Sequence, residues 1–402
     1  MADKNNLYSN LANFYNLNDK NFKEFLSDLY KEMINNHTDI KYIKEHLSDD
    51  IKEKIQYYID NGDFNINSKV EEKVNETLLR LEPNLVYKKD LKKPRYIHKY
   101  FGGNIWLENS YTIDKIEKIV KRSVEIGYNS FLIPCYHKFA NDIVTQTVNN
   151  SIIENTIDVC KKYNAKFIAL KIHISPNSKV IPSDIDTFMN NYKNIVKNFA
   201  DICVRKGINT IFISNEQVNL TSENRNIWES IINQCHGLGL KCFSSFAGFD
   251  DFTKCCFKDL LDGVGINYYP SINKDVNEIT ENNIINNIDL LNNKPYQFKF
   301  KQIKEIINKD ITVFISEIGC CNNIEGTYYP WAYEFSNDIM SEKSQALYYK
   351  AFLEEMGTKD IGIDGIFTWD LFYSEYRTES NMFSPLFNIE CENYIKKYLK
   401  EE

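Results

Sequence analysis

The sequence predicts an α/β protein, a (β/α)8 TIM barrel preceded by an N-terminal helical segment. From about residue 96 onward, short runs rich in β-branched and aromatic residues alternate with helical stretches. Eight such runs fit into roughly 300 residues, which is typical of a parallel barrel. The chain of 402 residues is long enough for a barrel and an appendage.

Residues 1–92 show a different pattern, because apolar side chains recur there at helical spacing and glycine is almost absent. The first predicted helix contains the run NFKEFLSDLYKEMI, and further helices are expected at about 39–60 and 67–81. The apolar stripe of the first predicted helix comprises Phe22, Phe25, Leu26, Leu29, Tyr30 and Met33. The stretch LKKPRY at 91–96 reads as a linker, so we place the barrel domain at 93–402.

The barrel strands are predicted from apolar runs that are separated by amphipathic stretches such as 112–127 and 185–207. An open, doubly wound sheet is the alternative, but no GxGxxG or P-loop motif follows an early strand. The predicted strands are 97–106, 129–136, 166–174, 210–216, 241–247, 263–269, 312–319 and 365–372.

Composition excludes several classes of function. The net charge of −8 argues against a nucleic-acid partner. The 10 cysteines and 6 histidines lack metal-ligand spacing, so we expect free buried thiols, no metal and no cofactor. No apolar run reaches the length of a membrane span, and the N-terminus lacks the features of a signal peptide. We therefore expect a cytoplasmic protein, or one that is carried on a virion or released by lysis.

Two glutamates mark the ends of predicted strands, Glu216 after TIFISN and Glu317 after TVFIS. Active sites of TIM barrels lie at the carboxyl ends of the strands. A carboxylate at the end of a buried strand is costly unless it is paired or functional. Retaining glycosidases need two carboxyl groups about 5 Å apart, one as acid/base and one as nucleophile. The alternative is that each glutamate caps a following helix, which glutamate does poorly.

Several stretches over about 96–390 resemble glycoside hydrolase clan A and, within it, family 113 of β-mannanases with its relatives in phage tail proteins. These stretches are ALKIHI, SNEQ, CCFKDLLDGVGINYYP, TVFISEIG and SQALYYKAFLEEM followed by GIFTWDLF. The resemblance implies a retaining β-glycoside hydrolase, endo-acting on a β-1,4-linked polysaccharide such as mannan or a cell-surface glycan. A non-catalytic glycan-binding or structural tail module on the same barrel is the alternative.

The resemblance also assigns roles to individual residues. Glu216 would be the acid/base, Glu317 the nucleophile, and Asn215 a hydrogen-bond donor to the 2-hydroxyl of the sugar. A tyrosine of the sixth strand would form a hydrogen bond with Glu317 and orient its carboxyl group. Relatives often have one more residue before the two tyrosines, so both Tyr268 and Tyr269 stay candidates.

Aromatic side chains complete the expected substrate site. By the same resemblance, Trp369 would stack beneath the sugar at the cleaved bond, unless it is a barrel core residue. His173 would either contact that sugar or be a satisfied core histidine. Trp106 and Trp331 would either line outer subsites or anchor loops.

The N-terminal segment looks similar to the N-terminal parts of phage tail and baseplate appendages. That resemblance rests on the composition of NGDFNINSKVEEKVNETL. It implies that residues 1–92 attach the protein to a particle or make it a homo-oligomer. The alternative is a helical cap that packs on the barrel.

Overall fold

The computed structural model describes residues 98–140, 143–176, 180–272, 296–336, 339–357, 361–373, 379 and 382–400. The chain divides into two units, Met1–Pro94 and Arg95–Glu402, and every described residue belongs to the second. The helices expected within residues 1–92 therefore lie outside the described residues, and the boundary between 92 and 93 stays a prediction.

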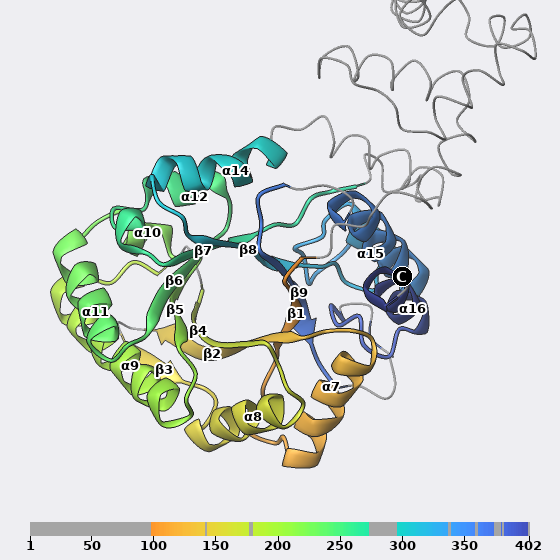
Figure 1. The fold of residues 1–402 in the computed structure, drawn as a ribbon, viewed down its shortest axis with the longest axis horizontal. Coiled ribbons are helices and arrows are strands. Elements are labelled where there is room, and N and C mark those ends of the chain that lie inside the picture. The colour runs from red at the N-terminus through yellow and green to blue at the C-terminus, as the bar shows by residue number, and fades with distance from the viewer. Residues whose placement is uncertain are drawn as a thin grey trace, which may run out of the picture. The chain divides into compact units, whose positions relative to one another are not determined.

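Eight parallel strands close into a barrel, because β1 pairs with both β2 and β9. Figure 1 shows them as a ring. This confirms the predicted (β/α)8 fold. The strands are β1 (Tyr100–Ile105), β2 (Ser130–Ala140), β4 (Phe167–Ser175), β5 (Thr210–Asn215), β6 (Lys241–Phe246), β7 (Gly263–Asn267), β8 (Thr312–Ile318) and β9 (Gly365–Leu371).

One strand was not predicted. β2 continues beyond the barrel to Ala140 and pairs antiparallel with β3 (Ile143–Gln146), so that the two form a hairpin. The side chains of β3 alternate between exposed and half-buried rather than buried. Because it carries no apolar run, the hairpin is not apparent from the hydrophobic pattern.

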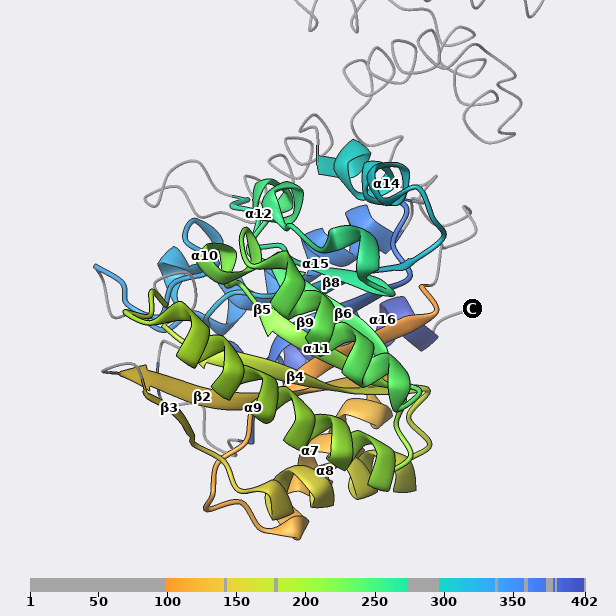
Figure 2. The same ribbon diagram turned by 90° about the vertical axis from the view of Figure 1, so that its left-hand side faces the viewer.

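Helices surround the strands on the outside of the barrel (Figures 1 and 2). Thr112 and Asp184 cap the first turns of two of them by accepting from backbone N–H groups. The helices are α7 (Ile113–Glu125), α8 (Asn150–Lys162), α9 (Ile185–Arg205), α10 (Val218–Thr221), α11 (Arg225–Gly237), α12 (Phe249–Lys254), η1 (Lys258–Leu260), α14 (Tyr296–Ile307), η2 (Ile324–Thr327), α15 (Glu342–Gly357) and α16 (Ile389–Lys400).

Five of the outer helices end in the same way. Just past the last turns of α7, α8, α9, α11 and α14, a residue adopts a positive φ: Gly127 (111°), Asn164 (58°), Gly207 (58°), Gly239 (76°) and Asn308 (56°). Glycine and asparagine tolerate this left-handed conformation best, and it satisfies the last carbonyl groups of a helix. The chain can then turn at once into the next strand.

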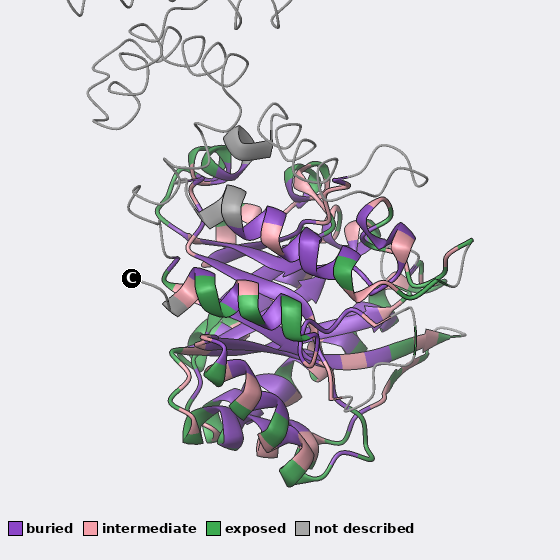
Figure 3. Ribbon diagram, turned by 90° about the vertical axis from the view of Figure 1, so that its right-hand side faces the viewer, coloured by how far each residue is buried: buried purple, intermediate pink, exposed green. Residues whose placement is uncertain are grey.

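A floor of aromatic rings fills the lower interior of the barrel. Neighbouring rings meet at centroid distances such as 5.1 Å for Phe212 and Phe243 and 5.1 Å for Phe314 and Phe367. This aromatic floor comprises Tyr100, Phe167, Phe212, Phe243, Phe314 and Phe367. Figure 3 shows that the strands around it are almost entirely buried.

Above the floor the interior becomes polar. Alternate residues of a strand share a face, so β4 carries Phe167, Ala169, Lys171 and His173 in order from the floor toward the mouth. In β7 the same layer holds Gly265, where a Cβ atom would collide with the hydroxyl groups of Ser316 and Ser245. The glycine is needed because the neighbouring strands place side chains against it.

All 10 cysteines fall within the described residues, and each is a free thiol. All are buried except Cys256, which is half-buried. This confirms the expectation of free buried thiols. No group of three or more histidine, cysteine, aspartate or glutamate side chains in the described ranges is arranged to hold a metal ion. None of the helices described is both long and apolar enough to cross a lipid bilayer.

Candidate active site

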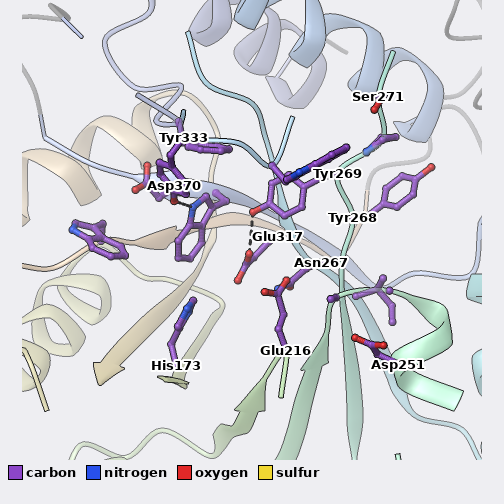
Figure 4. Close-up of a pocket in the computed structure, with 18 of the residues that line it drawn as sticks. His173, Glu216, Asp251, Asn267, Tyr268, Tyr269, Ser271, Glu317, Tyr333 and Asp370 are labelled. Atoms are coloured by element: carbon purple, nitrogen blue, oxygen red, sulfur yellow. Dashed lines mark hydrogen bonds between the residues drawn. The ribbon is translucent and has the colours of Figure 1, made fainter. Parts of the chain in front are cut away.

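A cavity of about 1100 Å³ opens at the carboxyl ends of the barrel strands. Its size suits more than one sugar ring, since pockets for small ligands usually hold ~300–1,000 Å³. The residues expected from the sequence that line it are Trp106, His173, Glu216, Tyr268, Tyr269, Glu317, Trp331 and Trp369. Asn215 does not line the cavity and is fully buried behind Glu216. Figure 4 shows Glu216 and Glu317 directed into the same space.

Glu216 follows the last residue of β5 in an unusual backbone conformation. Its φ is +53°, a left-handed value that a residue with a long side chain rarely adopts. The pairing of β5 with β6 shifts register between Phe212 and Asn215, and the Glu216 N–H donates to Ser245 O at 2.9 Å. Such irregularities re-aim side chains at active sites. Here the irregularity turns the Glu216 carboxyl toward the cavity.

The surroundings of Glu216 favour its protonated form. Burial raises the pKa of Glu216, and the negative charge of Glu317 raises it further. Three groups act in the opposite direction: Asn267 through a hydrogen bond, His173 through an electrostatic interaction, and Lys171 through its charge. The Asn267 Nδ2 group donates to Glu216 Oε1 at 2.7 Å. The net result is a carboxyl group that holds its proton above the ordinary pH range of a glutamate.

Glu317 lies in a different environment, although it belongs to the same cavity. The Lys171 ammonium, which is fully buried, forms an ion pair with Glu317 Oε1. The Tyr269 hydroxyl donates to Glu317 Oε2 at 2.9 Å. Both oxygens therefore accept from a donor, and one of the donors is a cation. Charge-assisted hydrogen bonds of this kind hold the carboxylate of Glu317 in a fixed orientation.

The two candidate tyrosines point in different directions (Figure 4). Tyr269 reaches Glu317 through its hydroxyl group. Tyr268 packs its ring edge-on against Phe300 at a centroid distance of 5.8 Å. Alternate residues share a face, so Tyr269 lies on the inward face of β7 together with Asn267 and Gly265. Tyr269, and not Tyr268, is therefore the tyrosine whose hydroxyl group contacts the carboxylate of Glu317.

A chain of hydrogen bonds crosses four strands beneath the two glutamates. Ser316 Oγ donates to Asn267 Oδ1 at 2.7 Å, and Asn267 Nδ2 also donates to Asn215 Oδ1 at 3.2 Å. Asn215 Nδ2 in turn lies 3.2 Å from His173 Nδ1. An amide nitrogen can only donate, so His173 Nδ1 accepts and the neutral ring carries its proton on Nε2. The network fixes both asparagine amides and the tautomer of His173.

Aromatic rings form one wall of the cavity. His173 stacks on Trp369 at a centroid distance of 5.9 Å, and Trp106 meets the edge of Trp369 at 6.0 Å. The ring of Tyr136 contacts both neighbours, with centroid distances of 5.0 Å to His173 and 5.3 Å to Trp106. The indole N–H of Trp369 donates to the Tyr333 hydroxyl at 2.6 Å. Flat, fixed rings of this kind suit the C–H faces of a sugar.

The segment between η2 and α15 brings a second group of aromatic residues to the cavity. Trp331 lines the cavity, yet 55% of its surface is exposed. Tyr329 lies 6.1 Å from Trp331 in an edge-on contact and is also exposed. An exposed indole beside a cavity is unusual for a residue that merely anchors a loop. A role for Trp331 at an outer subsite stays a prediction.

Sequence reasoning missed three contributors to the site: Lys171, Asn267 as a partner of Glu216, and Tyr333. A signal existed for Lys171, because a lysine in the middle of the apolar run FIALKIHI must be buried with a partner. Asn267 lies within the predicted strand 263–269, but nothing in the sequence marks it as a partner of Glu216. Tyr333 lies in a loop without periodicity, so no pattern marks it.

Comparison with known proteins agrees with this geometry. A family model described as Glycoside Hydrolase Family 113 matches residues 169–389, which is more than half of the chain. No match appears among curated proteins. A solved GH113 β-1,4-mannanase shares 16% identity, with a TM-score of 0.59 over 77% of this chain and 100% of that one.

Two further solved structures share the fold. The GH113 β-mannanase AaManA from Alicyclobacillus acidocaldarius is 13% identical, with a TM-score of 0.59 over 74% of this chain and 96% of that one. A β-glucuronidase from Lactobacillus rhamnosus is 13% identical, with a TM-score of 0.50 over 77% of this chain and 50% of that one. The family match confirms the resemblance seen in the sequence: the chain is a glycoside hydrolase and belongs to Glycoside Hydrolase Family 113.

Proposed function

We propose that this glycoside hydrolase cleaves a β-1,4-linked polysaccharide of the mannan type internally, with retention of anomeric configuration. The observation that carries the mechanism is the contrast between two carboxyl groups in one cavity. Burial and the charge of Glu317 raise the pKa of Glu216, whereas Glu317 is ion-paired with Lys171. Carboxyl groups in such opposite environments serve as acid and nucleophile in retaining glycosidases.

In the first step, a carboxylate oxygen of Glu317 forms a bond to the anomeric carbon. The bond from that carbon to the glycosidic oxygen breaks, and the proton of Glu216 passes to the departing oxygen. In the second step, a water molecule gives a proton to Glu216 while its oxygen attacks the same carbon, and the ester bond to Glu317 breaks. Both glutamates return to their starting states.

The substrate class is supported by the shape of the site and by its relatives. Trp369 and His173 form a wall suited to one sugar ring, and Trp331 extends the aromatic surface outward. A site with outer subsites fits a polymer better than a short glycoside. The solved family members to which this chain is similar are named β-mannanases.

The test is turnover of a panel of β-linked polysaccharides, including glucomannan and galactomannan, with the anomeric configuration of the first product followed by NMR. We expect new reducing ends within the chains and retained configuration. Glu317→Gln should abolish turnover, and Glu216→Gln should lower it by about 10²- to 10⁴-fold. Glu154→Gln removes a carboxylate from a surface ion pair with Arg205 and serves as the matched control. Inverted product, or binding without product release, would refute the proposal.

We propose in addition that residues 1–92 serve as an attachment or oligomerisation arm, either in a homo-oligomer or on a phage particle. The support is the apolar stripe in residues 22–33 and the division of the chain after Pro94. Light scattering on the full chain and on residues 95–402 tests this. An oligomer that persists without the arm, or a monomeric full chain that fails to bind particles, would contradict it.

A further inference from the structure

Lys171 occupies an unusual position for a lysine. It lies in the middle of β4, no part of it is exposed, and its ammonium contacts Glu317. The ammonium also lies 5.8 Å from the ring centroid of Trp369. Moving an ammonium group into a protein interior is costly unless a partner compensates for the lost hydration. In the resting enzyme that partner is the Glu317 carboxylate.

The proposed reaction removes this partner. When Glu317 becomes an ester, its negative charge disappears, and the buried ammonium would be left alone. At the same moment Glu216 has given up its proton and has become a carboxylate. Glu216 lines the same cavity as Glu317, and the charge of Lys171 lowers the pKa of Glu216, although less than His173 does. The loss of charge on one glutamate thus coincides with its appearance on the other.

We infer that Lys171 is a positioning residue that serves both glutamates in turn: it pairs with Glu317 before the covalent step and stabilises ionised Glu216 after it. This inference rests on the proposed function. One of the two glutamates is then a carboxylate at each stage of the reaction, and the buried ammonium of Lys171 keeps an anionic partner in both steps. Lys171 acts through the two glutamates and does not itself exchange a proton with the substrate.

Other charged or titratable groups face the same space and must be separated from Lys171. On β4, His173 also lowers the pKa of Glu216. Tyr269, after β7, donates to Glu317, and Asn267 donates to Glu216. Asp370 of β9 lines the cavity together with Tyr333. All of them stay in place when only Lys171 is replaced, so a single substitution isolates its charge.

The sharpest test uses a variant that imitates the covalent state. Glu317→Gln leaves a neutral side chain where the ester would be. The titration of Glu216 is followed through its carboxyl carbon by NMR, in Glu317→Gln and in the double variant Lys171→Met with Glu317→Gln. We expect the pKa of Glu216 to be higher by about one unit or more in the double variant, which is at least a tenfold change in proton affinity. Equal values in the two proteins would overturn the inference.

This measurement needs no turnover, so it separates the inference from the proposed function. A protein that hydrolyses no β-glycoside but shows the shift in Glu216 would refute the function alone. The double variant also avoids a folding failure, because it replaces both members of the buried pair and leaves no uncompensated charge.

Kinetics provide the second readout. In Lys171→Met, the acid limb of the pH profile of kcat/KM should move to higher pH by about one pH unit. Hydrolysis of a dinitrophenyl β-glycoside should show a larger initial burst than in the wild type, because the second step has lost its ionised base. Lys171→Arg, which keeps the charge, should restore both. Arg122→Met removes a cation from the ion pair with Glu392 and is the control. A Lys171→Met profile that superimposes on that of Arg122→Met would show a merely structural role.

Discussion

Tyr269 and Tyr268 are adjacent in the chain, yet it is the hydroxyl group of Tyr269 that donates to the Glu317 carboxylate, at 2.9 Å, whereas Tyr268 donates its backbone N–H to the Glu317 carbonyl oxygen. Hydrogen bonds to charged groups contribute about 1.5–3 kcal/mol. We therefore expect Tyr269→Phe to lower kcat/KM by about 10- to 100-fold while the protein stays folded. Tyr268→Phe is the matched change, and its effect should be clearly smaller. Equal losses in the two variants would mean that the bond to Glu317 does not matter for the reaction.

The raised pKa of Glu216 has consequences for both activity and stability. Because burial holds Glu216 in its protonated form, the folded state binds a proton more tightly than the unfolded state. The stability that comes from this proton is fully present below the ordinary pKa of a glutamate. It is lost as the pH rises through the raised pKa of Glu216.

Glu216→Gln should therefore gain stability relative to the wild type as the pH rises, since glutamine cannot ionise. Thermal unfolding of both proteins over a range of pH checks this. In the wild type, kcat/KM should fall over the same range as Glu216 loses its proton. A difference in Tm that does not change with pH would contradict the assignment.

Trp331 should matter only for long substrates. Its exposed indole lies at the edge of the cavity, beyond the wall formed by Trp369 and His173. An aromatic contact contributes about 0.5–1.5 kcal/mol, so Trp331→Ala should lower kcat/KM on a polysaccharide by about 2- to 10-fold. Activity on a short aryl glycoside should not change. Ile143→Ala, an exposed residue of the hairpin strand β3, controls for the loss of surface area. Equal effects on long and short substrates would exclude an outer subsite.

Gly265 allows the strands beneath the site to approach one another. A Cβ atom there would collide with the side chains of Ser316 and Ser245. Gly265→Ala should cost about 1–3 kcal/mol of stability, and it should lower activity because Ser316 holds Asn267 in place. Gly237→Ala is the control, since nothing lies within 4 Å of a Cβ at the end of α11. That change should be neutral or stabilising by about 0.5–1 kcal/mol. Denaturant unfolding and turnover assays on both variants would show a contradiction if Gly265→Ala were tolerated equally well.

The barrel was predictable because its strands are buried on both faces, so each one appears in the sequence as an apolar run bounded by turn residues. The β2–β3 hairpin lacks such a run and was missed. For the site, strand ends located Glu216 and Glu317. The sequence left the choice between Tyr268 and Tyr269 open, because it depends on the register of β7 against β8, which shifts at Asn267. The partner of Lys171 lies 146 residues away, a separation that no local pattern spans.

The aromatic floor affects how substrate, products and water reach the active site. Packed rings of Phe212, Phe243, Phe314 and Phe367 fill the lower interior of the barrel, so among the described residues they block the way to the two glutamates from below. We therefore expect substrate, products and water to use the opening at the carboxyl ends of the strands. In the proposed mechanism, the water for the second step therefore enters through the space that the first product has vacated. A sugar that returns to that space before water arrives would accept the bound glycosyl group. A high concentration of sugar at the opening would therefore favour transglycosylation over hydrolysis.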